Sequence, residues 1–574
     1  MTVPFKDRWL IRGALTLNSA LQLRTGFSEP RKVKGARDAA DETAEVALVH
    51  RDCDGLPVIL GSSLKGVLRS WLIERLPNEK ASIESIFGHE PRQWKQDPTK
   101  QAGRGGKAEF LDAFIAELPG FDGPFSAVPP LLVGRTAINR ETRTAAVERL
   151  FQGEQVPATT AFQVEVAGDS LTPHEVALLL AAFDGFNAGG GDVPIALGGG
   201  GSHGPGRTKW RLHSVRRMDV GAVYRWLSQP KPRPWREAIV DDPATACDRG
   251  ALTARANRLL AGADRPGWLA LDLRLAFSGP FLVNHPAWVK HKTSGSQHPD
   301  FEPMRDQNGR PLLPGSSVKG ALRAQAERIY RTVHGEDALA SPEESRDGTP
   351  RNAVEWLFGV GGEHRQHDPS PGPSPRNAVE WLFGVGGWRG MLTVSDFTEH
   401  ELPKEPEKTF AEQEFVAIDR FTGGAADGAK FKARMAEAPV LTGCLLLRVS
   451  PRRISDPLPG EDHREEPWTP QFAKPALGLM ALVLRDLVEG DVTFGFGAAK
   501  GFGACTAVIV GPPVIGPAAA LQAIFPGMLP HRLELPGGNL DHDQKKQAAK
   551  ALYGNAIAEA LAAFRAGKEP GNAG

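Results

Sequence analysis

Two short motifs in this chain carry groups that can hold a phosphate, and both motifs occur twice. GSSLKG at Gly61–Gly66 returns as GSSVKG at Gly315–Gly320, each time opening a segment in which apolar residues recur at helical spacing. Backbone N–H groups at a helix N-terminus, two hydroxyls and a lysine suit phosphodiester oxygens. The motif predicts a phosphate contact in each half of the chain. The alternative is a capped helix with a solvated lysine.

The two copies supply the same polar side chains. We expect the serine pairs to cap the helices and a basic residue one turn further on to extend the contact. The candidate RNA-binding residues of this motif are Ser62, Ser63, Lys65 and Arg69 in the first half, and Ser316, Ser317, Lys319 and Arg323 in the second.

A glycine-rich loop follows in each half, as GGGGSHGPG after Leu197 and GFGAAKGFG after Phe494. A dinucleotide site is disfavoured, because the loop follows a helix and precedes a strand, the reverse of that fingerprint. Glycine in such a loop allows another backbone to come close, with a strained turn as the alternative. The candidate RNA-binding residues here are Gly199, Gly201, Ser202, His203, Gly204, Gly497, Lys500 and Gly501.

A third shared segment is AINRET at Ala137–Thr142, matched by AIDRFT at Ala417–Thr422. Its arginines, Arg140 and Arg420, can clamp an RNA phosphate or stack on a base, or form surface ion pairs.

Carboxylates lie before each GSS motif. With the two motifs aligned, Asp52 lies opposite Asp306, whereas Asp300 lies opposite Val46. The second half therefore has a carboxylate where the first half has none, unless Asp41 or Glu45 takes that place by a shift in the loop. For any one of these residues the alternative is a solvated surface charge.

Composition limits the class of protein. A chain of 574 residues suits two to four domains, and 41% apolar residues are ample for packed cores. Lys+Arg equals Asp+Glu at 68 each, so bulk positive charge is not what would bind nucleic acid. Four dispersed cysteines, no apolar signal segment at the start and no apolar run of about 18 residues predict a cytoplasmic protein without a membrane span.

The recurring order of motifs predicts two units of one design. We place the first unit at 1–227, a proline-containing linker at 228–265, the second unit at 266–515 and a helical tail at 516–574. A segment at about 350–387 holds a local duplication, since PRNAVEWLFGVGG occurs identically at Pro350 and Pro375. We expect the second copy to be the packed one.

With these residues in hand, the chain resembles the RAMP superfamily of CRISPR-associated proteins, and within it the backbone-forming subunits of type III effector complexes. The family signature (I/L)PGSSLKGxLR is matched by ILGSSLKGVLR from Ile59 and LPGSSVKGALR from Leu313. The family's glycine-rich loop, of the form GGxxSRGxG, is matched by Gly199–Gly206 and Gly497–Gly503.

The resemblance implies an α+β fold of two tandem modified ferredoxin-like, RRM-related domains with thumb and lid insertions. It also implies guide RNA, target RNA and other CRISPR effector subunits as partners. In catalytic members an aspartate before the GSS motif supports divalent-metal-dependent cleavage of target RNA, in a D-x-P-x-x-(K/R)-D context. Asp300 and Asp306 keep that spacing, with Arg305 in place and Pro303 shifted by one.

The resemblance therefore makes Asp300 the candidate catalytic and metal-binding residue, with Mg²⁺ as the expected ion and Asp306 beside it. In the first unit the aspartate is replaced by Val46, so its site is inactive or served by Asp41, Asp38 or Glu45. Three alternatives stay open: a structural subunit that binds guide RNA without cutting, a guide-processing endoribonuclease that uses histidine, and a scaffold that binds a small anion.

Overall fold

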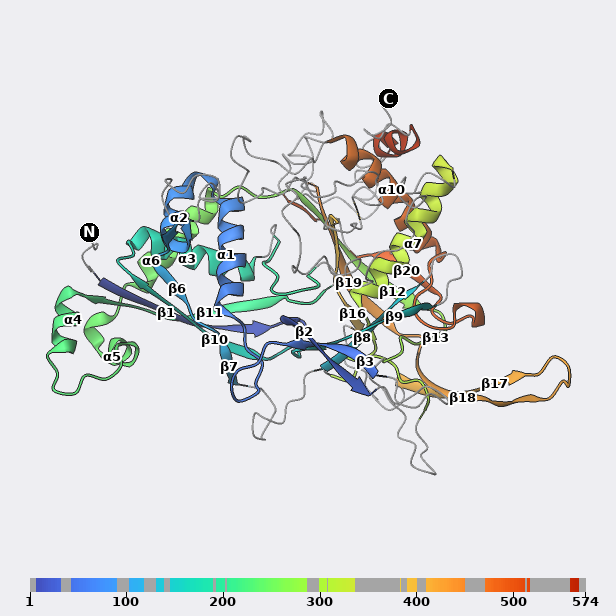
Figure 1. Ribbon diagram of the computed structural model, residues 1–574. Helices are drawn as coiled ribbons and strands as arrows, with labels where there is room; N and C mark the ends of the chain where they lie inside the picture. The colour runs from blue at the N-terminus through green and yellow to red at the C-terminus, as the bar shows by residue number, and fades with distance from the viewer. Residues whose placement is uncertain are drawn as a thin grey trace.

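The two halves of the chain fold into two units of the same design. The computed structural model describes residues 7–32, 43–89, 103–117, 131–138, 145–188, 193–201, 204–285, 299–306, 308–335, 382, 390–399, 409–449, 470–510, 514–516 and 558–566. Figure 1 shows the first unit around α1 and α3 and the second around α7 and α10. Within these residues no helix is long and apolar enough to cross a membrane.

Unit one is built on an antiparallel sheet with the strand order β11-β1-β10-β6, in which β7 also pairs with β10. Helices α1 and α3 pack on one face of this sheet, and α2 packs beside them. The bounds are β1 Asp7–Leu17, α1 Gly61–Arg75, α2 Lys80–Phe87, β6 Ala108–Phe110, β7 Phe114–Glu117, β10 Ala161–Asp169, α3 Pro173–Asp184 and β11 Thr208–Asp219.

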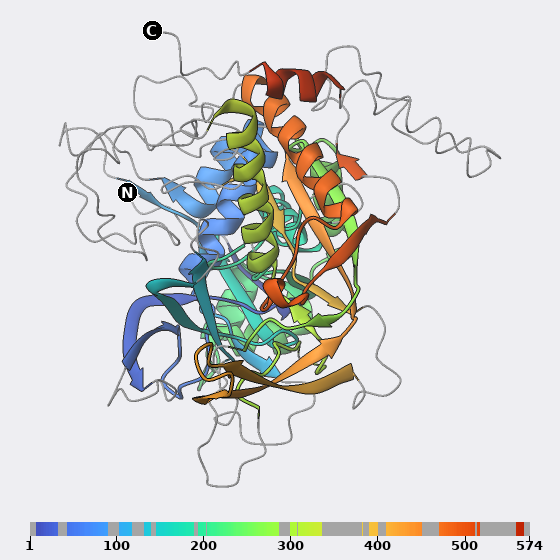
Figure 2. The same cartoon turned by 90° about the vertical axis from the view of Figure 1, so that its right-hand side faces the viewer.

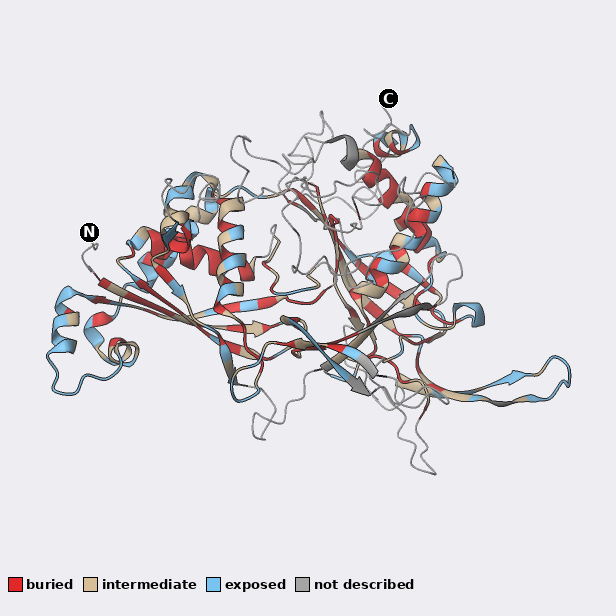
Figure 3. Ribbon diagram, viewed as in Figure 1, coloured by how far each residue is buried: buried red, intermediate tan, exposed pale blue. Residues whose placement is uncertain are grey.

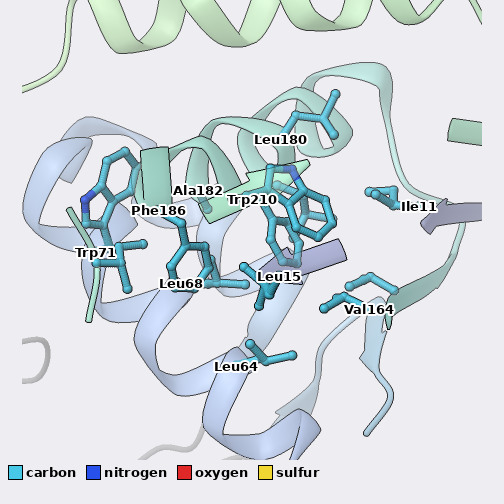
Figure 4. Close-up of a cluster of buried hydrophobic side chains, with 14 of the residues drawn as sticks. Ile11, Leu15, Leu64, Leu68, Trp71, Val164, Leu180, Ala182, Phe186 and Trp210 are labelled. Atoms are coloured by element: carbon cyan, nitrogen blue, oxygen red, sulfur yellow. The ribbon is translucent and has the colours of Figure 1, made fainter. Parts of the chain in front are cut away.

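Sequence periodicity explains this layer. Ile11 and Leu15 of β1 point to the helix-covered face, since side chains two apart in a strand share a face. Leu64 and Leu68 recur at one-turn spacing on α1 and are fully buried against them. Figure 4 shows this core, in which Trp71 of α1 gathers with these side chains and with Phe186.

Unit two repeats the design with the strand order β14-β16-β19-β12-β20, β15 pairing with β19 and β21 with β12. Helices α7 and α10 pack side by side against its core, as Figure 2 shows. The bounds are β12 Trp268–Phe277, β14 Leu312–Leu313, α7 Gly315–His334, β15 Leu392–Val394, β16 Phe397–Glu399, β19 Val440–Arg448, α10 Pro470–Glu489, β20 Cys505–Ile509 and β21 Val514–Gly516.

A smaller sheet accompanies each main sheet. In unit one β2 (Arg24–Lys32), β3 (Thr43–Val49), β9 (Ala145–Gln155) and β8 (Leu131–Ile138) are paired in that order. In unit two β13 (Pro280–Phe281), β18 (Ala425–Glu437) and β17 (Phe410–Ile418) are paired. The β17–β18 hairpin projects from the body, and its outer part is exposed in Figure 3.

The segment expected to be a linker, 228–265, is more ordered than a linker. Its helix α6 (Arg249–Ala261) packs on α3 and places Leu252 and Ala256 in the core of unit one. Helices α4 (Val220–Leu227) and α5 (Trp235–Asp241) lie on the opposite face of the sheet, where Ile239 contacts Leu10. Short elements complete the unit: β4 Gly88–His89, β5 Arg104–Gly105, η1 Pro77–Glu79, η4 Gly185–Asn187 and η5 Pro243–Thr245.

Part of the predicted tail also belongs to a core. Residues 558–565 form a helix whose Phe564 packs on Tyr330 and His334 of α7. Leu382, from the second copy of the duplicated segment, is fully buried in the same core, and the first copy lies outside the described residues. The predicted α+β class is confirmed by these two layered units.

The GSS motif offers a matched stability test. A Cβ at Gly61 would lie 2.0 Å from the carbonyl oxygen of Phe110, whereas one at Gly66 meets no described atom within 4 Å. We expect Gly61→Ala to cost about 1–3 kcal/mol by overpacking. Gly66→Ala, on the exposed side of α1, should stabilise by up to about 1 kcal/mol. Thermal unfolding of both variants measures this, and equal melting temperatures would contradict the close packing.

Candidate nucleic-acid interface and cleavage site

Each GSS helix is capped by an aspartate from a distant loop between two strands, not by its own serines. The N-cap residues are Leu60 and Pro314, whose side chains make no capping bond, so the predicted serine caps are wrong. Instead the N–H of Gly61 donates to Oδ1 of Asp112 at 2.8 Å, and the N–H of Gly315 donates to Asp396 at 2.7 Å. A carboxylate there also complements the helix dipole.

The serines are thereby left for another partner. Ser62 is exposed, and Ser63, Ser316 and Ser317 are half-buried. Lys65 and Arg69 of unit one are half-buried as well. In unit two the cations are more enclosed: Lys319 is 6% exposed, and Arg323 donates to Glu327 at 2.9 Å. The two copies of the motif are therefore unequal in access, which the sequence alone does not reveal.

The described parts of the two glycine loops share a pattern of left-handed glycines. Positive φ angles occur in matching pairs along the loops: Gly198 and Gly495, Gly200 and Gly497, Gly204 and Gly501, Gly206 and Gly503. A Cβ at Gly206 would lie 2.0 Å from the carbonyl oxygen of Leu197, and one at Gly503 would lie 1.8 Å from that of Phe494. Both loops thus depend on glycine for a close backbone approach, as expected. Gly199 and Gly201 lie in the first loop, and Ser202 and His203 lie outside the described residues.

Lys500 of the second loop is exposed and lies over three phenyl rings. Its Nζ is 4.6 Å from the ring centre of Phe415, 5.1 Å from that of Phe431 and 5.5 Å from that of Phe496. It sits in a short 3₁₀ turn, η8 (Ala498–Lys500). The rings attract the cation through their negative faces and hold it above β17 and β18.

The same aromatic cluster holds the loop of Asp300. Phe301 packs edge-on against Phe431 at 5.4 Å and stacks on Phe496 at 5.4 Å. Asp300 is half-buried, and its Oδ2 accepts the backbone N–H of Lys432 in β18 at 2.8 Å. The candidate loop, the hairpin and the glycine loop therefore converge at one place in unit two.

The carboxylate of Asp306 holds a turn. Its Oδ1 accepts the N–H groups of Asn308 and Arg310, each at 2.9 Å, and its Oδ2 accepts from Nε of Arg310 at 2.7 Å. Asp52 makes the same turn in unit one, with Oδ1 accepting from Asp54 and Leu56. The alignment of Asp306 with Asp52 is thus matched by a shared turn, and its carboxylate is engaged in holding that turn.

Unit one places an apolar residue at the position of Asp300. Val46 pairs in parallel with Gln152 of β9, as the Asp300 loop pairs with β18, and it is 0% exposed. Glu45 is exposed on β3 and accepts a hydrogen bond from the hydroxyl of Ser28. Asp41 and Asp38 lie outside the described residues.

A paired charge network flanks the cluster in unit two. Glu302 is buried and binds Arg305 and Arg434, the latter at 3.2 Å. Hydrogen bonds from Lys432 and Arg434 lower the pKa of Glu412 on β17. These cations are thus matched by carboxylates. This pairing agrees with the net charge of zero for the whole chain. Lys500 differs from these cations because aromatic rings hold it.

The hairpin tip carries exposed apolar and basic groups. Phe421 is 102% exposed and Ile418 is 61% exposed, with Arg420 exposed between them. Asp419 orders the turn, because its carboxylate accepts the N–H groups of Phe421 and Thr422, and these bonds lower its pKa. Arg140 of unit one lies outside the described residues.

A group of three carboxylates suited to a metal lies away from Asp300, among the described residues of unit two. Asp486, Glu489 and Asp491 cluster at the end of α10. Gln325 and Arg485 already bind the buried carboxylate of Asp486. This cluster is therefore an ion-pair network.

Comparison with known proteins gives one decisive match. The model of the RAMP superfamily matches residues 4–209 and 259–506. The chain belongs to the RAMP superfamily. Each match spans one unit, so the chain holds two RAMP units. No curated protein matches the chain. One solved structure, titled "Type III-B Cmr-beta Cryo-EM structure of the Apo state", is similar over 35% of this chain and 96% of its own, with 14% identity and a TM-score of 0.26.

Two features of the RAMP units were missed from sequence. The capping residues Asp112 and Asp396 follow β6 and β15, in the short patterns FLD and VSD, which are too degenerate to single out. The phenylalanines around Lys500 come from three distant segments, and the sequence shows no spacing that links them.

The cysteines offer a test of the RAMP core. Burial raises the pKa of Cys444 to about 11 and that of Cys505 to about 12, whereas Cys53 is exposed. Because the thiolate is the nucleophile, we expect iodoacetamide at pH 8 to label Cys53 readily, the half-buried Cys444 slowly and the buried Cys505 only after denaturation. Peptide mass spectrometry with and without guanidinium measures this. Native labelling of Cys505 as fast as that of Cys53 would overturn the packing of β20.

Proposed function

We propose that the chain is a subunit of a type III CRISPR effector complex that binds guide RNA and positions target RNA for metal-dependent cleavage in unit two. Membership in the RAMP superfamily and the GSS and glycine-loop motifs support this assignment. The sheet order in both units, with two helices on one face, supports the ferredoxin-like, RRM-related fold expected for such subunits. Guide RNA, target RNA and other effector subunits are the proposed partners.

One observation carries the cleavage proposal: Asp300, Lys500 and the projecting hairpin meet on a single aromatic cluster. An RNA strand crossing this cluster would meet the carboxylate of Asp300 and the ammonium group of Lys500, which can bind a phosphate. It would also run beside the hairpin whose tip carries the exposed Phe421. The hairpin also holds Asp300 through the N–H of Lys432, which fixes the carboxylate against the base of the hairpin.

The residues present fit a divalent ion of the Mg²⁺ type. Mg²⁺ keeps several waters and is commonly bound by one or two carboxylates and phosphate oxygens, which a half-buried Asp300 beside an RNA backbone would satisfy. When bound, the ion would neutralise the phosphate charge. Lys500 would hold a neighbouring phosphate, and the exposed Phe421 would separate stacked bases.

The reaction class follows from RNA chemistry. With the backbone splayed, the 2′-hydroxyl would give its proton to water and its oxygen would attack the adjacent phosphorus, while the bond to the 5′-oxygen breaks and that oxygen takes up a proton from water. The products are a cyclic phosphate and a 5′-hydroxyl, so DNA is inert. Geometry supplies most of the acceleration in such a site.

Unit one is proposed to bind RNA without cutting. A buried valine takes the place of Asp300 there, and no ion can bind to it. This matches the alternative of a structural guide-binding module for half of the chain. The exposed Ser62 and the half-buried Lys65 remain available for phosphate.

Asp300→Asn is the central test. In the complex assembled with its partner subunits and guide RNA, we expect this variant to lose one cut in labelled target RNA by at least about 100-fold while guide binding is kept. EDTA should abolish the same cut. Glu45→Gln is the matched control and should leave every cut intact. Unchanged cleavage in Asp300→Asn would reject the assignment, and a cut lost in Glu45→Gln would assign activity to unit one.

Lys500→Ala tests the phosphate contact. We expect weaker target binding that does not depend on base sequence, with the salt dependence of affinity reduced by about one counterion. The exposed Lys231, on the loop between α4 and α5, gives the control variant Lys231→Ala. Fluorescence anisotropy at several salt concentrations measures both. Equal salt slopes for the wild type and Lys500→Ala would exclude the contact.

A further inference from the structure

Helices α4 and α5 form an addition to unit one that the family match does not cover. The first match ends at residue 209 and the second begins at residue 259, and both helices lie between these limits. We call residues 220–241 the α4–α5 segment. Figure 1 shows it at the end of unit one that points away from unit two. Membership in the superfamily therefore does not assign it a role.

The α4–α5 segment is anchored to the sheet of unit one. The side chain of Asp219 caps α4. Nε1 of Trp226 donates to the carbonyl oxygen of Arg233 at 2.8 Å, which ties α4 to the turn before α5. Arg236 of α5 forms an ion pair with Glu165 of β10 at 3.2 Å. These contacts hold α4 in one orientation on the sheet.

The inner side of α4 is apolar, as expected for a helix that packs on a sheet. Ala222 is buried, and Val223 and Trp226 are half-buried beside it. They pack in one cluster with Leu10 of β1 and Met218 of β11. A surface helix of this kind ordinarily has a polar outer side.

The outer side of α4 is apolar as well. Val220, Tyr224 and Leu227 are 43%, 68% and 57% exposed. Their spacing of four and three residues places them on one side of the helix. Arg225 is the only charged residue of α4. Because a helix that is apolar on both sides is normally buried, we expect a partner to cover this outer stripe.

Helix α6 of the same unit shows the ordinary pattern. It buries Leu252 and Ala256 against α3, and its exposed side carries Thr253, Arg255 and Arg258. Apolar residues on the outer side are therefore a property of α4 and are not shared by α6.

The charges near the outer stripe fit an acidic partner. Residues 220–236 include four cations and no carboxylate. The side chain of Arg225 is 60% exposed, and its distance of 3.9 Å from Asp242 leaves it weakly paired. A carboxylate on a partner would therefore be attracted to Arg225.

Two other occupants fit the stripe less well. Single-stranded RNA is held by bases that stack on aromatic rings, and the aliphatic Val220 and Leu227 offer no ring. A second copy of this chain, docked through the same stripe about a two-fold axis, would bring Arg225 towards its own equivalent. Like charges facing each other oppose such a contact.

We propose that α4 is the docking site for an acidic amphipathic helix of another effector subunit. That helix would lay its apolar side on Val220, Tyr224 and Leu227 and place a carboxylate near Arg225, in the way that amphipathic helices bind apolar surfaces. The proposal rests on the proposed function for the statement that the partner is an effector subunit. It adds a contact between proteins that lies outside the two RAMP matches and involves neither RNA nor Asp300.

Photo-crosslinking in the assembled complex tests the occupant. The full chain with benzoylphenylalanine in place of Tyr224, assembled with its partner subunits and guide RNA, should form a ribonuclease-resistant crosslink on irradiation. Mass spectrometry should map the crosslink to a partner helix that combines apolar residues with Asp or Glu. Benzoylphenylalanine in place of Arg255, on the exposed side of α6, is the control and should give no such product.

The other results of this experiment contradict the proposal. A crosslink to RNA, to a second copy of this chain or to a peptide without carboxylates would overturn it. The absence of any crosslink from position 224 would overturn it as well.

Substitutions on α4 give a second readout. Leu227→Asp and Arg225→Glu should each weaken binding of the crosslinked subunit about tenfold or more, since one loses apolar burial and the other loses charge attraction. Both side chains are exposed, so the melting temperature of the isolated chain should stay the same. Arg255→Glu is the charge-matched control and should leave the subunit bound. Affinity of the immobilised full chain for that subunit measures all three.

Guide binding and target cleavage on the same complexes separate this proposal from the proposed function. If both α4 variants keep the subunit while RNA is bound and cut, the docking site is rejected and the proposed function stands. If the wild-type chain binds neither an effector subunit nor guide RNA, both are rejected.

Discussion

The aspartate that caps each GSS helix is the interaction on which the rest of the architecture depends. The first N–H groups of a helix have no partner within it, and here a loop between two strands supplies a carboxylate to one of them. This bond fixes the helix against the sheet edge at the point where Gly61 nearly touches Phe110. Because the cap comes from elsewhere, the serines of the motif are released for another partner.

In unit two the capping aspartate, Asp396, makes a second contact. Asp396 holds the helix of unit two and also contacts Gly204 in the glycine loop of unit one, so one residue joins a helix to the neighbouring unit. The loop can approach so closely because glycine has no Cβ and accepts a positive φ.

The two units differ in the residues at the position of Asp300. Unit two brings the loop of Asp300 and a ring-bound lysine together on one aromatic cluster, whereas unit one buries Val46 at the position equivalent to Asp300. Under the proposed function, the chain would combine a cutting and a non-cutting version of one fold in a fixed order. Because both units belong to one chain, their order and spacing are fixed by the covalent link. Separate subunits would have no such link.

The sequence by itself determined the duplication, the α+β class, the course of the main helices and strands and the alignment of Asp300 with Val46. Each of these rests on local periodicity or on recurrence of short motifs, which can be read along the chain. Only the tertiary structure decided which groups cap the helices, that Asp306 holds a turn, that α6 belongs to unit one, and that the rings gather under Lys500. Those outcomes join residues far apart in the chain, and such pairings leave no periodic trace in the sequence.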